Sequence, residues 1–286
     1  MWQFLKSISL GSYNFAITAL VVLIALIIII LAINVGPSNI NLATILENPT
    51  QVYYDILLFR LLRVSMAFVV GCGLATSGCI FQSLLKNPLA DPYNLGISSG
   101  AACGASIAII TNNMQYIALA ALIGGISTVT IIFLIAKKIN FHTTAIILSG
   151  IALTFVLSSS ILLLFALAKP DKIHKTLMWM SGDISMARFD YIIPFSCIIV
   201  TLMFFSILLH RQLDIISFGT QFATTQGVHQ WHIIALFWIA SLITSITVAT
   251  AGIIGFIGLV IPHAIRIFKA EHIFLLPISA IAGGST

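Results

Sequence analysis

Long uncharged runs of apolar residues alternate with short polar segments along the chain. The first run, Phe15 to Val35, has no charged residue. It is about as long as the ~20 residues that a helix needs to cross a ~30 Å hydrocarbon core. Six more runs of this kind follow: Val64–Leu85, Leu95–Ile110, Met114–Ala136, Thr143–Ala168, Tyr191–Leu209 and Ile233–Ala251. The pattern therefore predicts seven membrane-spanning helices.

Two further apolar segments complete the pattern. Gly252 to Ile265 is rich in glycine and contains Pro262, so it is expected to cross only as a short or kinked helix. A ninth apolar run begins at Ile273 and is still apolar at Thr286. This run is too short to cross a bilayer. The sequence predicts an all-α membrane protein, a polytopic helical bundle. We expect one transmembrane domain over residues 1–286, cut off inside its ninth span.

The composition leads to the same class of protein. Hydrophobic residues make up 59% of the chain and charged residues only 7%, against roughly 25% charged in an average soluble domain. A soluble globular protein is therefore excluded, and membrane lipid is the expected surrounding. The net charge of +5 comes from residues scattered singly along the loops, so no nucleic-acid surface is predicted.

The loop charges do not fix the orientation in the membrane. When alternate loops are assigned to opposite sides, seven Lys and Arg residues share the side of the N-terminus and six lie on the other. Orientation follows an excess of these residues on the cytoplasmic side. A difference of one residue leaves the topology open.

Motifs for enzymatic chemistry are absent from the sequence. It contains no G-x-x-x-x-G-K-[ST] phosphate loop, no G-x-S-x-G turn and no H-E-x-x-H pair, so no catalytic residue, cofactor or metal site is predicted. The four cysteines lie in apolar runs and are expected to be small buried hydrophobic residues. No Asp, Glu, Lys or Arg lies in the middle of the seven runs, which argues against the ion or proton relay of a secondary transporter.

Small residues recur at helical spacing within two of the runs. Gly96, Gly100 and Gly104 repeat every four residues, and the preceding run has Gly71, Ala75 and Cys79 at the same spacing. Such a face lets two helix backbones approach closely, although a substrate pore would also accept it. We interpret the glycines as helix-packing positions.

Four polar motifs in the first half and one in the second resemble a known family. The first four are Arg60-Leu-Leu-Arg63, Gly78-Cys-Ile-Phe-Gln82, Asn87-Pro-Leu-Ala-Asp-Pro92 and Leu95-Gly-Ile-Ser-Ser-Gly-Ala101. The last is Gly252-Ile-Ile-Gly-Phe-Ile-Gly-Leu-Val-Ile-Pro-His263, followed by Arg266. Together they are similar to the FecCD/BtuC-type permeases of ABC importers, which take up iron-siderophore, haem or vitamin B12. The resemblance runs from about Leu58 to the last residue.

The resemblance implies a BtuC-like type II ABC importer permease with about ten spans, of which roughly eight to nine are represented here. It implies an inner (plasma) membrane protein with a cytoplasmic N-terminus that works as a homodimer. Its partners would be two copies of an ABC ATPase subunit and a periplasmic or surface substrate-binding protein. ATP hydrolysis would reside in the separate ATPase chain. The implied function is import of a metal chelate, with a ferric siderophore favoured, by alternating access.

The family's motifs also imply roles for individual residues. Arg60 and Arg63 match arginines that face the binding protein, where acidic side chains would pair with them. A pair of side chains that snorkel at the end of a span is the alternative. Leu62 stands where the family usually has proline, so a different local geometry is expected here.

The long polar stretch from Arg211 to His232 matches the family's ATPase coupling loop. The matching positions are Ser217, Gly219, Ala223 and Gly227, of which the two glycines are expected to break two short helices. A plain cytosolic connector is the alternative. Thr220 and Gln226 stand where the family more often has an acidic residue and a leucine.

His142 and Thr143 match the short turn that narrows the pathway on the cytoplasmic side of the family's permeases, so a gate is implied. Without the resemblance, Thr143 or Thr144 would be interpreted as a helix N-cap. Two other functions stay open for the whole chain. One is a channel or a secondary transporter without ion coupling, and the other is a truncated remnant that does not transport.

Overall fold

The computed structural model describes residues 2–36, 51–139, 141–182, 184, 189–268 and 271–286. In these ranges the chain is built from helices and contains no strand. The helices are α1 (Trp2–Asn34), α3 (Gln51–Leu84), η1 (Pro92–Leu95), α4 (Ile97–Ile110), η2 (Met114–Tyr116), α5 (Ile117–Lys138), α6 (Thr143–Leu167), α7 (Pro170–Met180), α8 (Phe189–Leu208), α9 (His210–Ser217), α10 (Thr220–Thr225), α11 (Gln230–Ala251), α12 (Ile257–Phe268) and α13 (His272–Gly284).

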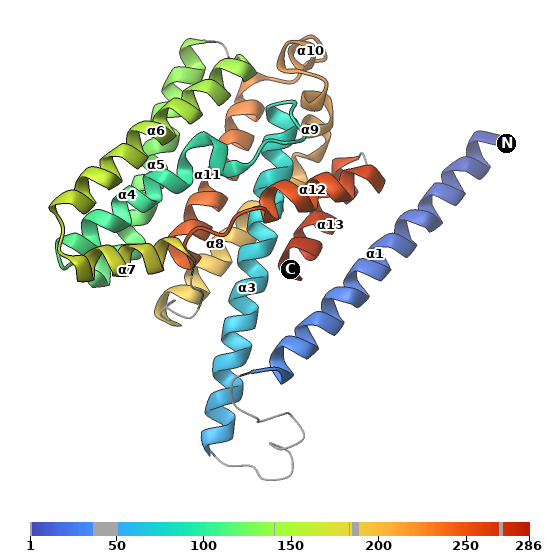
Figure 1. The fold of residues 1–286 in the computed structure, drawn as a ribbon. Helices are drawn as coiled ribbons and strands as arrows, with labels where there is room; N and C mark the ends of the chain where they lie inside the picture. The colour runs from blue at the N-terminus through green and yellow to red at the C-terminus, as the bar shows by residue number, and fades with distance from the viewer. Residues whose placement is uncertain (1, 37–50, 140, 183, 185–188, 269–270) are drawn as a thin grey trace.

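Helix α3 forms the centre of the bundle. It contacts α1, α8, α9, α11, α12 and α13, and every residue from Val70 to Leu84 is buried. Helices α4, α5 and α6 lie together on one side of α3, while α12 and α13 lie on the other (Figure 1). Small side chains along α3 make this central position possible. A Cβ atom on Gly71 would collide with the backbone of Gly283, and one on Gly78 with the backbone of Gly258.

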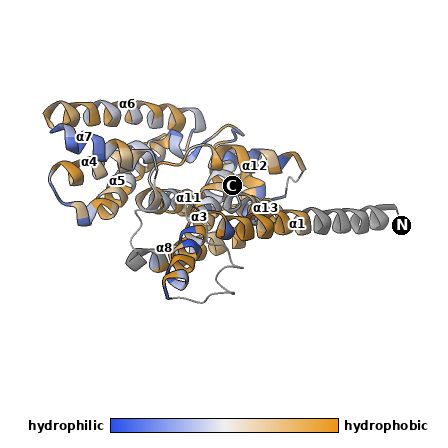
Figure 2. Ribbon diagram, turned by 60° about the horizontal axis from the view of Figure 1, so that its bottom comes forward, coloured by the Kyte–Doolittle hydropathy of each residue, from blue (hydrophilic) through white to orange (hydrophobic). Residues whose placement is uncertain are grey.

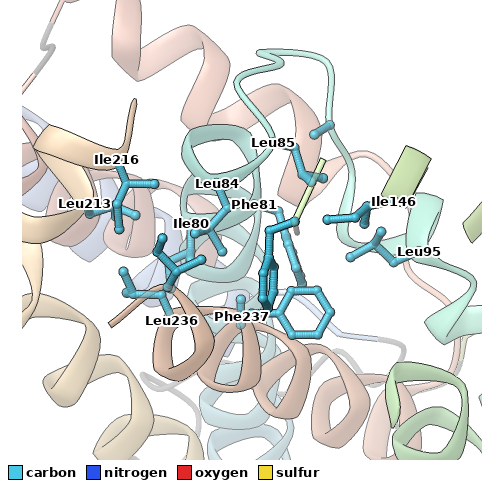
Figure 3. Close-up of a cluster of buried hydrophobic side chains, with 14 of the residues drawn as sticks. Ile80, Phe81, Leu84, Leu85, Leu95, Ile146, Leu213, Ile216, Leu236 and Phe237 are labelled. Atoms are coloured by element: carbon cyan, nitrogen blue, oxygen red, sulfur yellow. The ribbon is translucent and has the colours of Figure 1, made fainter. Parts of the chain in front are cut away.

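The largest cluster of buried apolar side chains surrounds the second half of α3. Phe81 of α3 packs edge-to-face on Phe237 of α11, with ring centroids 6.0 Å apart. Leu213 and Ile216 of α9 belong to the same cluster, as Figure 3 shows. The core therefore reaches from the membrane-spanning helices to the short helix α9.

Each of the nine predicted apolar runs contains a helix, but the described helices differ in length. Four are long and apolar enough to cross a membrane: Gln51–Leu84, Met114–Lys138, Thr143–Leu167 and Gln230–Ala251. The pair Ile193–Leu208 and His210–Ser217, bent by 64°, would make a fifth. Shorter apolar helices are Ile97–Ile110, Ile257–Phe268 and His272–Gly284, and the described part of the first run, Thr18–Asn34, belongs to the longer helix α1. The prediction of seven full-length spans is therefore too simple.

The segment before α4 explains one short helix. Pro92 begins the 3-10 turn η1, and Asp91 accepts a hydrogen bond from the backbone N–H of Tyr93 at 2.9 Å. Gly96 then adopts a left-handed conformation with φ of 72°, which separates η1 from α4. Leu95 thus lies in a turn inside the bundle, and α4 begins only at Ile97.

The chain between α11 and α12 leaves the helical conformation, as the glycines and Pro262 predict. Gly252 and Phe256 have φ values of 74° and 69°. The hydroxyl of Tyr93 donates to the carbonyl of Ile254 at 2.9 Å, which provides a partner for a carbonyl outside a helix. Helix α12 is then only 12 residues long and contains Pro262.

Two local predictions are wrong. Residues 170–180 lie between two predicted spans, where charged residues are counted as loop charges, but they form the helix α7, because Pro170 and Asp171 suit the first turn of a helix. This helix is largely hydrophilic, in contrast to α6 and α13 (Figure 2). The expectation of four buried cysteines fails because Cys103 is half-buried and Cys197 is exposed on α8.

Candidate functional site

Polar residues gather at the two ends of the bundle. One end carries α9, α10 and the turn between α5 and α6, and the other carries α7 and the first turns of α3 (Figure 1). We call them the α9–α10 end and the α7 end. The sequence-predicted coupling and gate residues lie at the former, and the predicted docking arginines lie at the latter.

The α9–α10 segment has the two-helix form that its glycines predict. Gly219, with φ of 128°, lies between α9 and α10, and Gly227, with φ of 83°, follows α10. Both glycines lie in a region of φ that disfavours side chains. Ser217 donates to the carbonyl of Asp214 at 2.6 Å near the end of α9. Ala223 is fully buried and anchors α10 in the core cluster.

The sequence motifs did not single out two aromatic residues of this segment that are exposed in the structure. Phe218 is 71% exposed and Phe222 is 49% exposed, and their ring centroids lie 6.0 Å apart. Large apolar side chains that are paired on a polar segment indicate a surface that a partner covers. Their spacing of four residues was the available signal in the sequence.

Asp214 ties α9 to the first residue of α13. Its Oδ1 accepts the backbone N–H of His272 at 2.9 Å and the His272 ring Nδ1–H at 2.6 Å. Partial burial acts to raise the pKa of Asp214, but the hydrogen bonds from His272 outweigh it and the net pKa is lowered. A lowered pKa in the folded state stabilises the fold above the ordinary pKa of aspartate. This contribution is lost as the pH falls through the lowered value.

The predicted gate residues lie at the start of α6. His142 is the exposed N-cap residue, without a side-chain capping hydrogen bond, and Thr143 is half-buried in the first helical position. The alternative prediction of a threonine N-cap is therefore wrong. The preceding residue, Phe141, is buried and packs on Phe133 of α5 with centroids 6.1 Å apart. This packing attaches the turn to the same core cluster that holds α9 and α10.

At the α7 end, Arg60 and Arg63 line a pocket of about 420 Å³ together with residues of three other segments. Both arginines lie inside α3, which continues without a break through Leu62, because leucine keeps the backbone N–H that proline lacks. Arg60 is half-buried and donates to the carbonyl of Ile33 at 3.2 Å and to that of Asn34 at 3.5 Å. It thereby caps α1. Arg63 is exposed.

The three glycines singled out in the sequence have different neighbours. Gly100 lies against Thr128 and Gly124 of α5, where a Cβ would collide with the Thr128 hydroxyl and come within 2.6 Å of the Gly124 carbonyl oxygen. Gly104 lies in the same way against the backbone of Ala120. Gly96 instead faces α6, at Thr154 and Gly150. The first two lie where α4 and α5 approach most closely.

We expect Gly100→Ala to lower the free energy of unfolding by about 1–3 kcal/mol, because the added methyl group would overpack a contact with the Thr128 side chain and the Gly124 backbone. The melting temperature of the detergent-purified protein measures this loss. Gly255→Ala is the matched control, since a Cβ there would meet open space. Equal melting temperatures for the two variants would contradict the packing role of Gly100.

In the part of the chain that the structure describes, no group of three His, Cys, Asp or Glu side chains lies close enough together to hold a metal ion. The buried residues between the two bundle ends are mainly small and apolar.

Comparison with known proteins shows which protein family the chain matches. A sequence model of the FecCD transport family matches residues 20–286. The hemin transport system permease protein HmuU of Yersinia pestis is 32% identical over 272 residues, which cover 90% of this chain and 81% of that protein. The Fe(3+) dicitrate transport system permease protein FecD of Escherichia coli is also 32% identical, over 81% of this chain and 73% of its own.

More distant similarity supports the fold. The cobalamin import system permease protein BtuC of Halobacterium salinarum is 32% identical over 79% of this chain and 62% of its own length. A solved structure described as a metal-chelate type ABC transporter in an inward-facing conformation superimposes with a TM-score of 0.83. It is 24% identical in sequence, and the match covers 95% of this chain and 87% of that one. The helical arrangement is therefore that of a known membrane fold.

Proposed function

Since this chain belongs to the FecCD transport family, we propose that it is the permease subunit of a binding-protein-dependent ABC importer. The cargo we propose is a metal chelate, with an iron chelate favoured. The observation that carries the proposal is the family match over residues 20–286. It is supported by relatives named for hemin, cobalamin and ferric dicitrate transport. The protein is a multi-pass membrane protein.

In the proposed assembly two copies of the chain form a homodimer with two ATPase subunits and one substrate-binding protein. The N-terminus and the α9–α10 end face the cytoplasm, where the ATPase binds. The exposed Phe218 and Phe222 support this orientation, because an apolar surface on a polar segment suits a protein partner better than open water. The α7 end then faces outward, toward the binding protein.

The proposed residue roles follow this orientation. Arg63 and Arg60 contribute positive charge to the binding-protein surface, where acidic side chains would pair with them. Ser217, Gly219, Ala223 and Gly227 shape the ATPase coupling segment. His142 and Thr143 are proposed to narrow the pathway at its cytoplasmic end. Rocking of the two copies would open the pathway alternately to the two sides.

The test is ATP-driven uptake into proteoliposomes that contain the permease, its ATPase and an external binding protein. Hemin, ferric dicitrate and cobalamin serve as separate labelled probes. We expect uptake of at least one iron chelate that requires both ATP and the binding protein. Uptake by the permease alone would instead support a channel or a secondary transporter, and failure of all three probes in an assembled complex would contradict the proposed cargo class.

A further inference from the structure

Four side chains from four helices form a hydrogen-bonded series at the α9–α10 end. Arg266 of α12 donates from Nη2 to the hydroxyl of Ser83 on α3 at 3.1 Å. Ser83 Oγ lies 2.6 Å from Nε2 of His272 on α13. His272 Nδ1 lies 2.6 Å from Oδ1 of Asp214 on α9. We call this series, Arg266–Ser83–His272–Asp214, the polar link.

The hydrogen-bonding capacity of each group sets the direction of the polar link. A carboxylate only accepts, so the His272 ring donates from Nδ1 to Asp214. A neutral ring then presents Nε2 as an acceptor to the Ser83 hydroxyl, whose single proton is shared between this nitrogen and the carbonyl of Cys79 at 3.0 Å. The Arg266 guanidinium only donates, so Ser83 accepts from it. The link therefore connects the cation of Arg266 to the anion of Asp214 through one hydroxyl and one ring, an arrangement in which neighbouring hydrogen bonds strengthen one another.

The surroundings favour this neutral form of His272. The residue is only 1% exposed, and a protonated ring would place a second buried positive charge near that of Arg266. Asp214 is the acidic partner of the ring, and His210 of α9 is the further titratable group whose charge acts on it. With a neutral ring, the charges of Arg266 and Asp214 balance across the link.

We propose that the polar link positions α9 on the bundle and transmits displacement of the α9–α10 segment to α13 and α12. The proposal rests on the proposed function, in which the ATPase moves that segment. Leu213 and Ile216 also hold α9 in the core, but apolar contacts are non-directional and change register more easily than a series of directional hydrogen bonds.

The link is also costly to break. In the described part of the chain, Nε of Arg266 is buried without a hydrogen-bond partner, so loss of the Ser83 hydroxyl would leave a second donor of the same guanidinium unsatisfied. Unsatisfied buried donors are unfavourable, and more so when charged. The four helices are therefore expected to move together rather than separate at this point.

The first test compares uptake with ATP hydrolysis in the same reconstituted complex. Asp214→Ala and His272→Ala are each expected to lower the cargo imported per ATP by about tenfold, with basal ATP hydrolysis and assembly retained. The double variant is expected to be no worse than either single variant, because both remove one connection. Asp214→Asn keeps an acceptor oxygen and should restore most of the loss. Asp171→Ala, an exposed acid on α7, is the matched control.

A second measurement, of the distance between two helices, applies also to variants that form little complex with the ATPase. Spin labels at Arg211→Cys on α9 and Ile273→Cys on α13, in a background without the native cysteines, report the distance between the two helices. With the link intact, we expect the same distance with and without ATP. Asp214→Ala removes both hydrogen bonds between α9 and α13 and is expected to make this distance depend on nucleotide.

The possible failures are distinguishable. A wild-type complex that imports no chelate would contradict the proposed function itself. A wild-type complex that imports normally, with uptake per ATP unchanged in the variants or with additive losses in the double variant, would overturn only the inference about the polar link. A nucleotide-dependent distance in the intact protein would overturn it as well.

Discussion

Replacing Arg63 with glutamate is expected to weaken binding of the substrate-binding protein by about 2–4 kcal/mol, or roughly 30-fold to 1,000-fold in Kd. Arg63 is exposed beside the pocket at the α7 end, so reversal of its charge would convert attraction to an acidic partner into repulsion. The Kd of the detergent-purified permease for its binding protein, measured at low and at physiological salt, checks this result. The effect should shrink as salt rises.

Arg60 provides the matched comparison, because it has a structural role in addition to its proposed docking role. Its guanidinium caps the carbonyls of Ile33 and Asn34. Arg60→Glu is therefore expected to lower the melting temperature as well, since a carboxylate at the C-terminus of α1 faces carbonyl oxygens. Arg60→Lys should keep much of both functions. ATPase assembly should stay unchanged in all these variants, and unaltered docking of Arg63→Glu would remove the arginines from the docking surface.

Replacing Phe218 and Phe222 together with alanine is expected to weaken ATPase binding by about 100-fold or more, because exposed aromatic residues at a buried interface each contribute about 2 kcal/mol or more. Neither ring belongs to the buried core, so the permease should keep its melting temperature. Co-purification of the ATPase and titration of its affinity in detergent measure the loss.

The control for this prediction is an aromatic residue of similar exposure elsewhere. Phe204 is exposed on α8 and is not part of the α9–α10 segment, and Phe204→Ala should leave the ATPase affinity within about twofold. If the double phenylalanine variant binds the ATPase as tightly as the wild type, the α9–α10 surface is not the ATPase contact. The proposed orientation of the bundle would then need another basis.

The apolar pattern predicted the helices well and their ends less well. Runs such as Thr143–Ala168 and Ile233–Ala251 became α6 and α11 with nearly the same bounds, because an uncharged stretch in lipid has to satisfy its backbone within a helix. The pattern missed α7, whose amphipathic sequence has few apolar residues in a row. It also treated Leu95 as part of a span, although Pro92 and Gly96 place it in a turn.

The candidate site was only partly visible in the sequence. Motif positions such as Arg60 and Gly219 stood out because charged residues are rare and because glycine allows positive φ. The pairing of Asp214 with His272 spans 58 residues, and no local pattern links the two. The same holds for Arg60, whose hydrogen bonds to the end of α1 add a helix-capping role to the docking role expected from the sequence.

The sequence by itself determined that this protein is a helical membrane protein of a transport family, since hydrophobicity and local motifs act through neighbouring residues along one helix. Only the tertiary structure decided which glycines meet another backbone, which aromatic residues remain exposed, and which polar side chains join four helices at one end. Those facts depend on the packing of distant segments around α3, where close contact between small residues sets the positions of every other helix.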